Sequence, residues 1–168
     1  MSTKLNRLEG PHMKSILVLV AAVLTAIPSC APRPRAELAG LQGVEIGYHS
    51  PMLSIEIKNG SLSFTRQVDV KYAKPWSATP ESYKERTGGG SISGQQVRAL
   101  LDAADACGFF ALNDAYGAPG DERYYAYEIS ITQAGRRKTV VFRSNPSYAE
   151  APSCFVTLQE KITALAGK

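Results

Sequence analysis

Residues 93–116 constrain the fold most, because they predict an amphipathic helix that runs directly into a short aromatic segment. Ser93 is followed three residues later by Gln96, a capping-box pattern in which each side chain takes up a free backbone amide of the first helical turn. Gly108 is expected to end the helix, since glycine reaches the left-handed conformation without steric cost. The apolar residues recur at helical spacing and predict one buried stripe: Val97, Leu100, Leu101 and Ala104.

The aromatic segment after this helix is too apolar for an exposed loop and too irregular for a strand. It contains Phe109, Phe110 and Leu112, and we expect it to close the helix onto a sheet. A second helix is expected to begin near Pro152. Its apolar stripe consists of Phe155, Leu158, Ile162 and Leu165.

Two β-hairpins are predicted. In the first, residues 53–65, Asn59-Gly60 lies between alternating strands and favours a type I′ turn. That turn places Ile57 opposite Leu62 and Ile55 opposite Phe64, so apolar residues meet on one face. In the second hairpin, a two-residue loop at Gly135-Arg136 places Ile131 opposite Val140 and Ile129 opposite Phe142. Tyr125 and Tyr127 share that face and are expected in the core.

These elements predict an α+β fold with the order ββαββα. Its antiparallel sheet consists of the two hairpins, with a fifth strand where the alternation continues through Val68, Val70 and Tyr72, and both helices pack on one face. His49-Ser50-Pro51 is interpreted as a turn, residues 73–90 as a long loop and residues 113–123 as a polar turn region. One domain at residues 43–168 accommodates all of them.

An apolar run at residues 16–27 follows Lys14 and ends at Pro28. It has the layout of a signal-peptide core and is shorter than the ~20 residues that a membrane-spanning helix needs. Met13 is therefore the expected natural start, and residues 1–30 are interpreted as a leader. Residues 31–42 contain two prolines and are interpreted as a flexible tether.

The leader ends Ile27-Pro28-Ser29-Cys30, which resembles a bacterial lipobox. In that motif the cysteine is acylated and becomes the new N-terminus, so Cys30 is the predicted lipidation site. Two or more acyl chains suffice for stable membrane attachment. A plain secreted protein and a retained anchor are the alternatives.

The remaining cysteines, Cys107 and Cys154, lie at the end of the first predicted helix and the start of the second. A disulfide between them suits an oxidising compartment, and two buried thiols are the alternative. No Cys/His spacing typical of a zinc site is present, and no cofactor is expected. The formal net charge of +4 falls when the leader is removed, and such a small charge favours no nucleic-acid partner.

The core positions resemble those of uncharacterised bacterial envelope lipoproteins that carry a small α+β domain of unknown function. The pattern consists of Phe109-Phe110-x-Leu112-x-x-x-Tyr116 after Leu100-Leu101, then Asp121, then Ile129 and Ile131 on one strand, and Ala151-Pro152 before the closing helix. The resemblance implies that fold and an envelope location, and it brings no catalytic residue.

No catalytic constellation is recognised. His49 is the only histidine after the leader, and no Gly-x-Ser-x-Gly motif accompanies it. Trp76, Tyr124 and Tyr148 form the predicted binding surface, because tyrosine and tryptophan are common at recognition surfaces. The function predicted is a non-catalytic envelope protein, lipid-anchored in the outer membrane facing the periplasm, that binds a protein, a glycan or a small ligand. The alternative is a soluble periplasmic hydrolase or inhibitor, and a deep pocket holding His49 beside a carboxylate and a serine would favour it.

Overall fold

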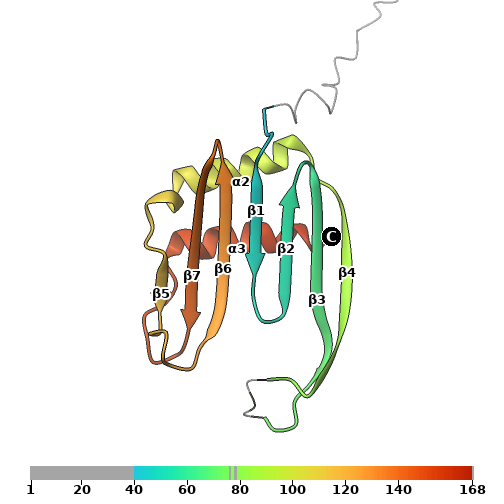
Figure 1. Ribbon diagram of the computed structural model, residues 1–168, viewed down its shortest axis with the longest axis vertical. Helices are drawn as coiled ribbons and strands as arrows, with labels where there is room; N and C mark the ends of the chain where they lie inside the picture. Colours follow the sequence, from blue (N-terminus) through green and yellow to red (C-terminus); the bar gives the residue numbers. More distant parts are fainter. Residues whose placement is uncertain (1–39, 76, 78, 168) are drawn as a thin grey trace, which may run out of the picture. The chain divides into compact units, whose positions relative to one another are not determined.

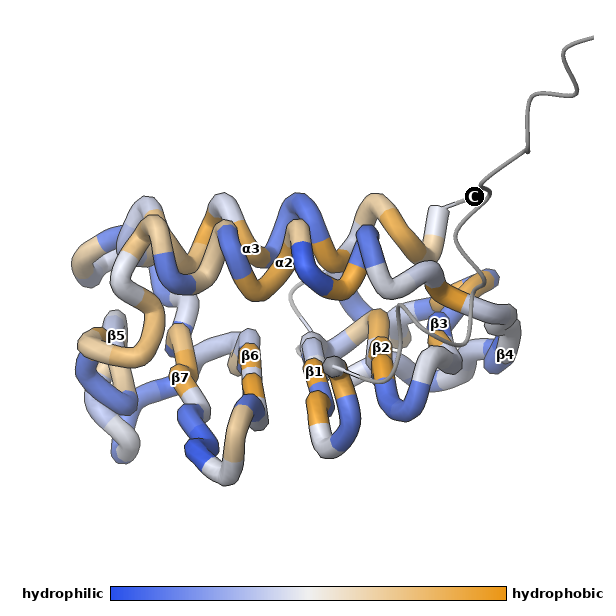
Figure 2. The backbone as a smooth tube through the Cα atoms, turned by 90° about the horizontal axis from the view of Figure 1, so that it is seen from above, coloured by the Kyte–Doolittle hydropathy of each residue, from blue (hydrophilic) through white to orange (hydrophobic). Residues whose placement is uncertain are grey.

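The computed structural model describes residues 40–75, 77 and 79–167, and these form one seven-stranded sheet with both helices on one face (Figures 1 and 2). The order across the sheet is β4-β3-β2-β1-β6-β7-β5. Neighbouring strands are antiparallel except β5 and β7, which are parallel. The strands are β1 (Glu45–His49), β2 (Leu53–Lys58), β3 (Ser61–Lys71), β4 (Ser82–Ser91), β5 (Ala115–Gly117), β6 (Tyr125–Gln133) and β7 (Arg136–Ser144). The helices are α2 (Gly94–Ala106) and α3 (Ser153–Leu165), with a 3-10 helix η1 at Phe109–Ala111.

The predicted two-hairpin sheet with the order ββαββα was wrong. The hairpins are present, but β1 lies between them and β4 and β5 form the edges of a mixed sheet. His49 ends β1, so the turn begins only at Ser50. The predicted loop at residues 73–90 contains most of β4, and the predicted polar turn at residues 113–123 contains β5.

Strand β4 was missed because its glycines carry no strand signal, yet packing requires one of them. Gly88 pairs directly with Phe64 on β3, and a Cβ added at Gly88 would collide with the Phe64 ring. Gly47 interrupts the pattern of β1 for a similar reason. A Cβ there would lie 2.6 Å from Ser130 Oγ on the neighbouring β6. In both strands glycine is a consequence of close approach by a neighbour.

The register of the first hairpin is confirmed, with Ile57 opposite Leu62 and Ile55 opposite Phe64. The register of the second was wrong by two residues. Its turn is Ala134-Gly135, with φ of 50° and 76°, and Ile129 therefore lies opposite Val140. Because side chains alternate with a period of two, this shift leaves the same residues on the core face.

The predicted capping box begins α2. Ser93 Oγ accepts from the Gln96 amide at 3.2 Å, while the Ser93 amide donates to Gln96 Oε1 at 3.1 Å. Gly108 follows the helix with φ of 75°, as expected. The 3-10 helix after it buries Phe109 completely, and α3 begins directly after Pro152, as predicted. Among the described residues no helix is long and apolar enough to cross a membrane.

The core lies between the sheet and the helices. Its completely or almost completely buried side chains come from the four strands β1, β2, β6 and β7, from η1 and from α3. They are Ile46, Ile55, Ile57, Phe109, Ile129, Ile131, Val140, Phe155, Leu158 and Ile162. A disulfide joins Cys107 at the end of α2 to Cys154 in the first turn of α3, with the Cα atoms 5.2 Å apart. The covalent bond therefore ties the two helices together above the sheet.

We expect the double substitution Cys107→Ala and Cys154→Ala to lower the free energy of unfolding. The bond closes a loop spanning 47 residues. The chain-entropy model gives about 4 kcal/mol for a loop of that length. Urea denaturation of the two proteins measures the difference, and reduced wild-type protein should match the variant. Equal midpoints for oxidised wild type and variant would contradict this expectation.

Candidate functional site

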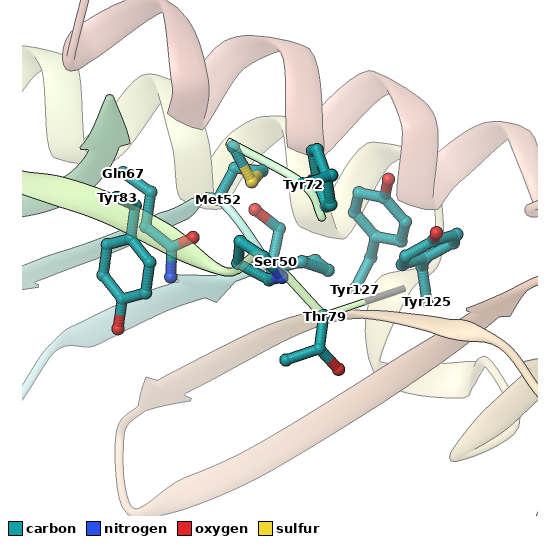
Figure 3. A pocket seen from close by; sticks show the side chains of 10 residues that line it. Ser50, Met52, Gln67, Tyr72, Thr79, Tyr83, Tyr125 and Tyr127 are labelled. Atoms are coloured by element: carbon teal, nitrogen blue, oxygen red, sulfur yellow. The ribbon is translucent and has the colours of Figure 1, made fainter. Parts of the chain in front are cut away.

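The strands extend past the two helices, and a pocket lined by aromatic side chains lies at that uncovered end (Figures 1 and 3). Its volume of about 490 Å³ is within the range of small-ligand sites. Six large hydrophobic side chains among the described residues are exposed to solvent, and four of them line this pocket. Exposed apolar surface is therefore concentrated at this site. The lining residues are Ser50, Pro51, Met52, Gln67, Tyr72, Thr79, Pro80, Tyr83, Tyr125 and Tyr127, and we call this site the tyrosine pocket.

The turn between β1 and β2 forms one wall. Ser50 closes this turn, because its amide donates to the Leu53 carbonyl at 2.9 Å and its Oγ accepts from the Leu53 amide at 3.1 Å. The Gln67 amide donates to the Met52 carbonyl at 2.9 Å, which ties the turn to β3. Backbone bonds therefore hold Ser50, Met52 and Gln67 in place without using the Gln67 side-chain amide.

A bulge in the β3–β4 pair shapes the opposite wall. The register shifts between Val68 and Lys71, and Asp69 adopts a positive φ of 53°. The chain then returns through the Glu81 amide, which donates to the Lys71 carbonyl at 2.8 Å. Such bulges increase the local twist of a strand pair. After the bulge between Val68 and Lys71, Tyr72 and Tyr83 line the pocket, and their exposed fractions are 46% and 45%.

The third wall is the beginning of β6, where the prediction of core residues was wrong for Tyr125. Tyr125 is 46% exposed, and Tyr127 is half-buried with its ring centroid 6.3 Å from that of Phe142. Both have the same strand parity as the buried Ile129 and Ile131. Figure 3 shows the two rings next to each other at one side of the pocket, with Gln67 and Tyr83 at the other.

The chemistry of the tyrosine pocket is aromatic and uncharged. None of its ten lining residues carries a formal charge. Four tyrosines offer ring faces together with hydroxyl groups, while Ser50, Gln67 and Thr79 add further donors and acceptors. The site therefore suits a neutral ligand with both apolar faces and hydrogen-bonding groups.

Of the predicted binding surface, the described residues Tyr124 and Tyr148 do not line this pocket. Trp76 lies outside the described residues. Tyr124 is half-buried, with the Arg143 guanidinium carbon 5.5 Å from its ring centroid, and Tyr148 is 38% exposed but does not line the pocket. The predicted lipidation site, Cys30, also lies outside the described residues.

His49 lies in a second, polar depression of about 240 Å³, whose lining includes Glu56, Glu128 and Ser130. Cross-strand pairing places His49 opposite Glu128, and Gly47 leaves room next to Ser130 Oγ. The ring contact, however, is between His49 Nδ1 and the Ser54 hydroxyl at 2.9 Å, and both side chains are at the surface. A Ser-His-acid unit needs the serine on one ring nitrogen and the acid on the other. Among the described residues no carboxylate bonds to His49.

Within residues 40–75, 77 and 79–167, no three His, Cys, Asp or Glu side chains are grouped in a way that would hold a metal ion. The three carboxylates around His49 belong to separate strands, and Glu45 forms an ion pair with Lys58. The lining of the tyrosine pocket, by contrast, carries no charge.

Tyr48 is buried and lies one residue before the end of β1. Ionisation of its hydroxyl gives a prediction for alkaline pH. Burial raises the pKa of its hydroxyl above the ordinary 10.0, although a hydrogen bond with Ser50 partly opposes that effect. A raised pKa stabilises the fold below pH 10, and this contribution is lost as the pH rises through the folded-state value. The free energy of unfolding of the wild-type protein should therefore decrease between about pH 9 and about pH 11, and Tyr48→Phe should make this decrease smaller. Urea titrations across that range measure the slope, and identical slopes for both proteins would contradict the expectation.

The chain was also compared with known proteins. No protein-family model matches the sequence, and no curated protein matches it either.

Proposed function

We propose that this protein is a non-catalytic binding module of the bacterial cell envelope that holds a neutral glycan in the tyrosine pocket. The pocket carries the proposal, because it gathers exposed aromatic rings around uncharged hydrogen-bonding groups. The apolar face of a sugar ring packs on a tyrosine ring, and sugar hydroxyls match the Gln67 amide and the Ser50 and Thr79 hydroxyls. A charged ligand would find no counter-charge in the lining.

The proposed location rests on the N-terminal sequence. The apolar run at residues 16–27 followed by Cys30 supports export and acylation, and the resemblance to envelope lipoproteins supports the same address. Acyl chains on Cys30 would hold the domain at the outer membrane through the residues that precede Leu41, which is buried in the core of the domain. The binding site would then face the periplasm.

The alternative predicted from the sequence is a secreted hydrolase or inhibitor. It would use His49, which does lie in a depression with three carboxylates and a serine. That depression has half the volume of the tyrosine pocket, and the histidine is exposed and bonded to Ser54. The binding function is therefore preferred.

The binding test compares tyrosines inside and outside the pocket. We expect Tyr125→Ala or Tyr72→Ala to weaken binding of a neutral tetrasaccharide at least about tenfold, which is the loss expected for removing one stacked ring at about 1.4 kcal/mol. Tyr148→Ala is the matched control, because that tyrosine is exposed but lies outside the pocket. Isothermal titration calorimetry of the full chain with cello-, malto- and chitotetraose measures the affinities.

The outcomes are distinct. Equal losses in all three tyrosine variants, or no binding of any of the sugars, would contradict the glycan proposal. Binding of a proline-rich peptide in their place would assign the pocket to a protein partner. Hydrolysis of a sugar that is abolished by His49→Ala would support the enzyme alternative instead.

The lipid anchor is tested by the intact mass of the protein purified from a bacterial host. We expect the mature chain to begin at Cys30 and to carry a diacylglyceryl group and an amide-linked acyl chain. Cys30→Ala should lose that mass and leave the membrane fraction, since acyl chains supply the attachment. A wild-type chain without added lipid mass would contradict this part of the proposal.

A further inference from the structure

Strand β4 presents a free backbone edge. Among the described residues no strand pairs with its outer side. The Ile92 amide donates to the Gly60 carbonyl at 3.0 Å, so these two residues form a hydrogen-bonded pair. The pairing of β3 with β4 continues from there in the same register, with Ser61 opposite Ser91 and Leu62 opposite Gly90. Hydrogen-bonded pairs alternate along an antiparallel ladder, so even-numbered residues of β4 bond to β3. The amides and carbonyls of Glu85, Thr87 and Gly89 therefore point away from the sheet and are available to another strand.

A shallow groove borders this edge on the helix-facing side of the sheet. It has a volume of about 220 Å³, and its lining includes Gly89 and Gly90 of β4, which present no side chains. Leu62 and Phe64 come from β3, Ile92 precedes α2, and Leu165 ends α3. An added strand would therefore find apolar surface next to Gly88 and Gly90.

Three positively charged side chains lie on the same face farther along the β3–β4 pair. Arg66 and Arg86 lie directly opposite each other, and Lys84 follows two residues from Arg86. Like charges in directly opposed positions destabilise a strand pair. Within the described part of the chain no carboxylate forms an ion pair with either arginine, and the ion pair of Lys84 with Asp69 is 77% and 62% exposed. An anionic partner would remove this repulsion.

We propose that β4 binds an extended acidic peptide segment of another protein as an eighth strand of the sheet. Backbone bonds form with Glu85, Thr87 and Gly89, which is the strand-addition mode of peptide recognition. Acidic side chains at alternate positions of the segment lie opposite Lys84 and Arg86. Apolar side chains two and four positions farther on lie opposite Gly88 and Gly90 and enter the groove. This inference uses a different surface from the glycan site and does not depend on it.

A second copy of this chain is a poorer occupant of the same edge. Two copies of β4 that pair antiparallel are related by a two-fold axis perpendicular to the sheet. The helix-facing sides of both sheets then lie on the same side of the joined sheet. Arg66, Lys84 and Arg86 of both copies would then share one face around the axis. The charge repulsion already present in one sheet would be increased by the second.

The probe is a fluorescein-labelled peptide of eight residues, with glutamate at two alternate positions, valine at the next two alternate positions and threonine between them. Both sequence directions are made, because β4 is open to a parallel or an antiparallel strand. Fluorescence anisotropy with the full chain measures binding. We expect saturable binding in one direction, and at least about tenfold weaker binding when lysine replaces both glutamates.

Two substitutions test the backbone and the charge separately. Thr87→Pro removes an outward amide and leaves the β3–β4 ladder bonded, so it should abolish binding while the circular dichroism spectrum is unchanged. Arg86→Glu should weaken binding of the glutamate peptide at least about tenfold and strengthen binding of the lysine peptide. Lys161→Glu, an exposed charge reversal on α3, is the matched control and should change neither affinity.

Several results would overturn the proposal. They are equal binding of the glutamate and lysine peptides, no binding of either direction, and an Arg86→Glu variant that behaves like Lys161→Glu. Sedimentation of the chain alone as a dimer that Thr87→Pro dissociates, without peptide binding, would assign the edge to self-association. The charge reversal tests the proposal even if the proline variant fails to fold. Tetrasaccharide binding should persist in Arg86→Glu, so a failure here is distinguishable from a failure of the glycan proposal.

Discussion

Burial of one apolar sheet face beneath α2 and α3 is the interaction on which the rest of the structure depends. The isoleucines of β1, β2 and β6 and the large side chains of η1 and α3 are almost completely excluded from solvent. Each such side chain contributes about 1.5–3 kcal/mol relative to an exposed one. No buried polar or charged residue interrupts this layer among the described residues. The helices therefore have to lie across the middle of the strands, where these side chains are.

The position of the helices explains why the pocket is at one end of the sheet. The strands are longer than the layer that covers them, so the core-facing row of β6 continues beyond the helices (Figure 1). Ile129 and Ile131 lie under the helices and are completely buried, whereas Tyr125 comes earlier on the same row and is 46% exposed. Tyrosine suits that place because its ring packs against neighbouring residues while its hydroxyl reaches water. The pocket is the uncovered continuation of the core face.

Local signals in the sequence predicted the elements whose structure is determined locally. The capping box predicted the start of α2, the glycine after it predicted the end of that helix, and Asn59-Gly60 predicted the turn of the first hairpin. All three are found. The second hairpin lacked such a signal, because Ala134 adopts a positive φ that its residue type does not favour. The alternation alone identified the core face but left the register uncertain by two residues.

The missed strands depend on contacts between distant residues. Gly88 belongs to a strand because Phe64, two dozen positions earlier, fills the space of its side chain. Strand β5 pairs with β7 over only three residues, too few for any periodicity. The candidate site was missed for the same reason. Its aromatic character was predicted, but Tyr72, Tyr83 and Tyr125 come together only after the bulge in β3–β4 and the placement of β6 beside β1.

The two edges of the sheet differ in a way that follows from the same packing. Edge β5 is three residues long and parallel to its neighbour, and short edge strands offer little backbone to another chain. Edge β4 is ten residues long, contains no proline and is exposed along nearly all of its length. Its glycines allow Phe64 to pack against the core, and the same glycines remove the side chains that would shield the backbone and the groove behind it. A requirement of the core has therefore left one edge open, and the positive charges beside it determine which strand can be added.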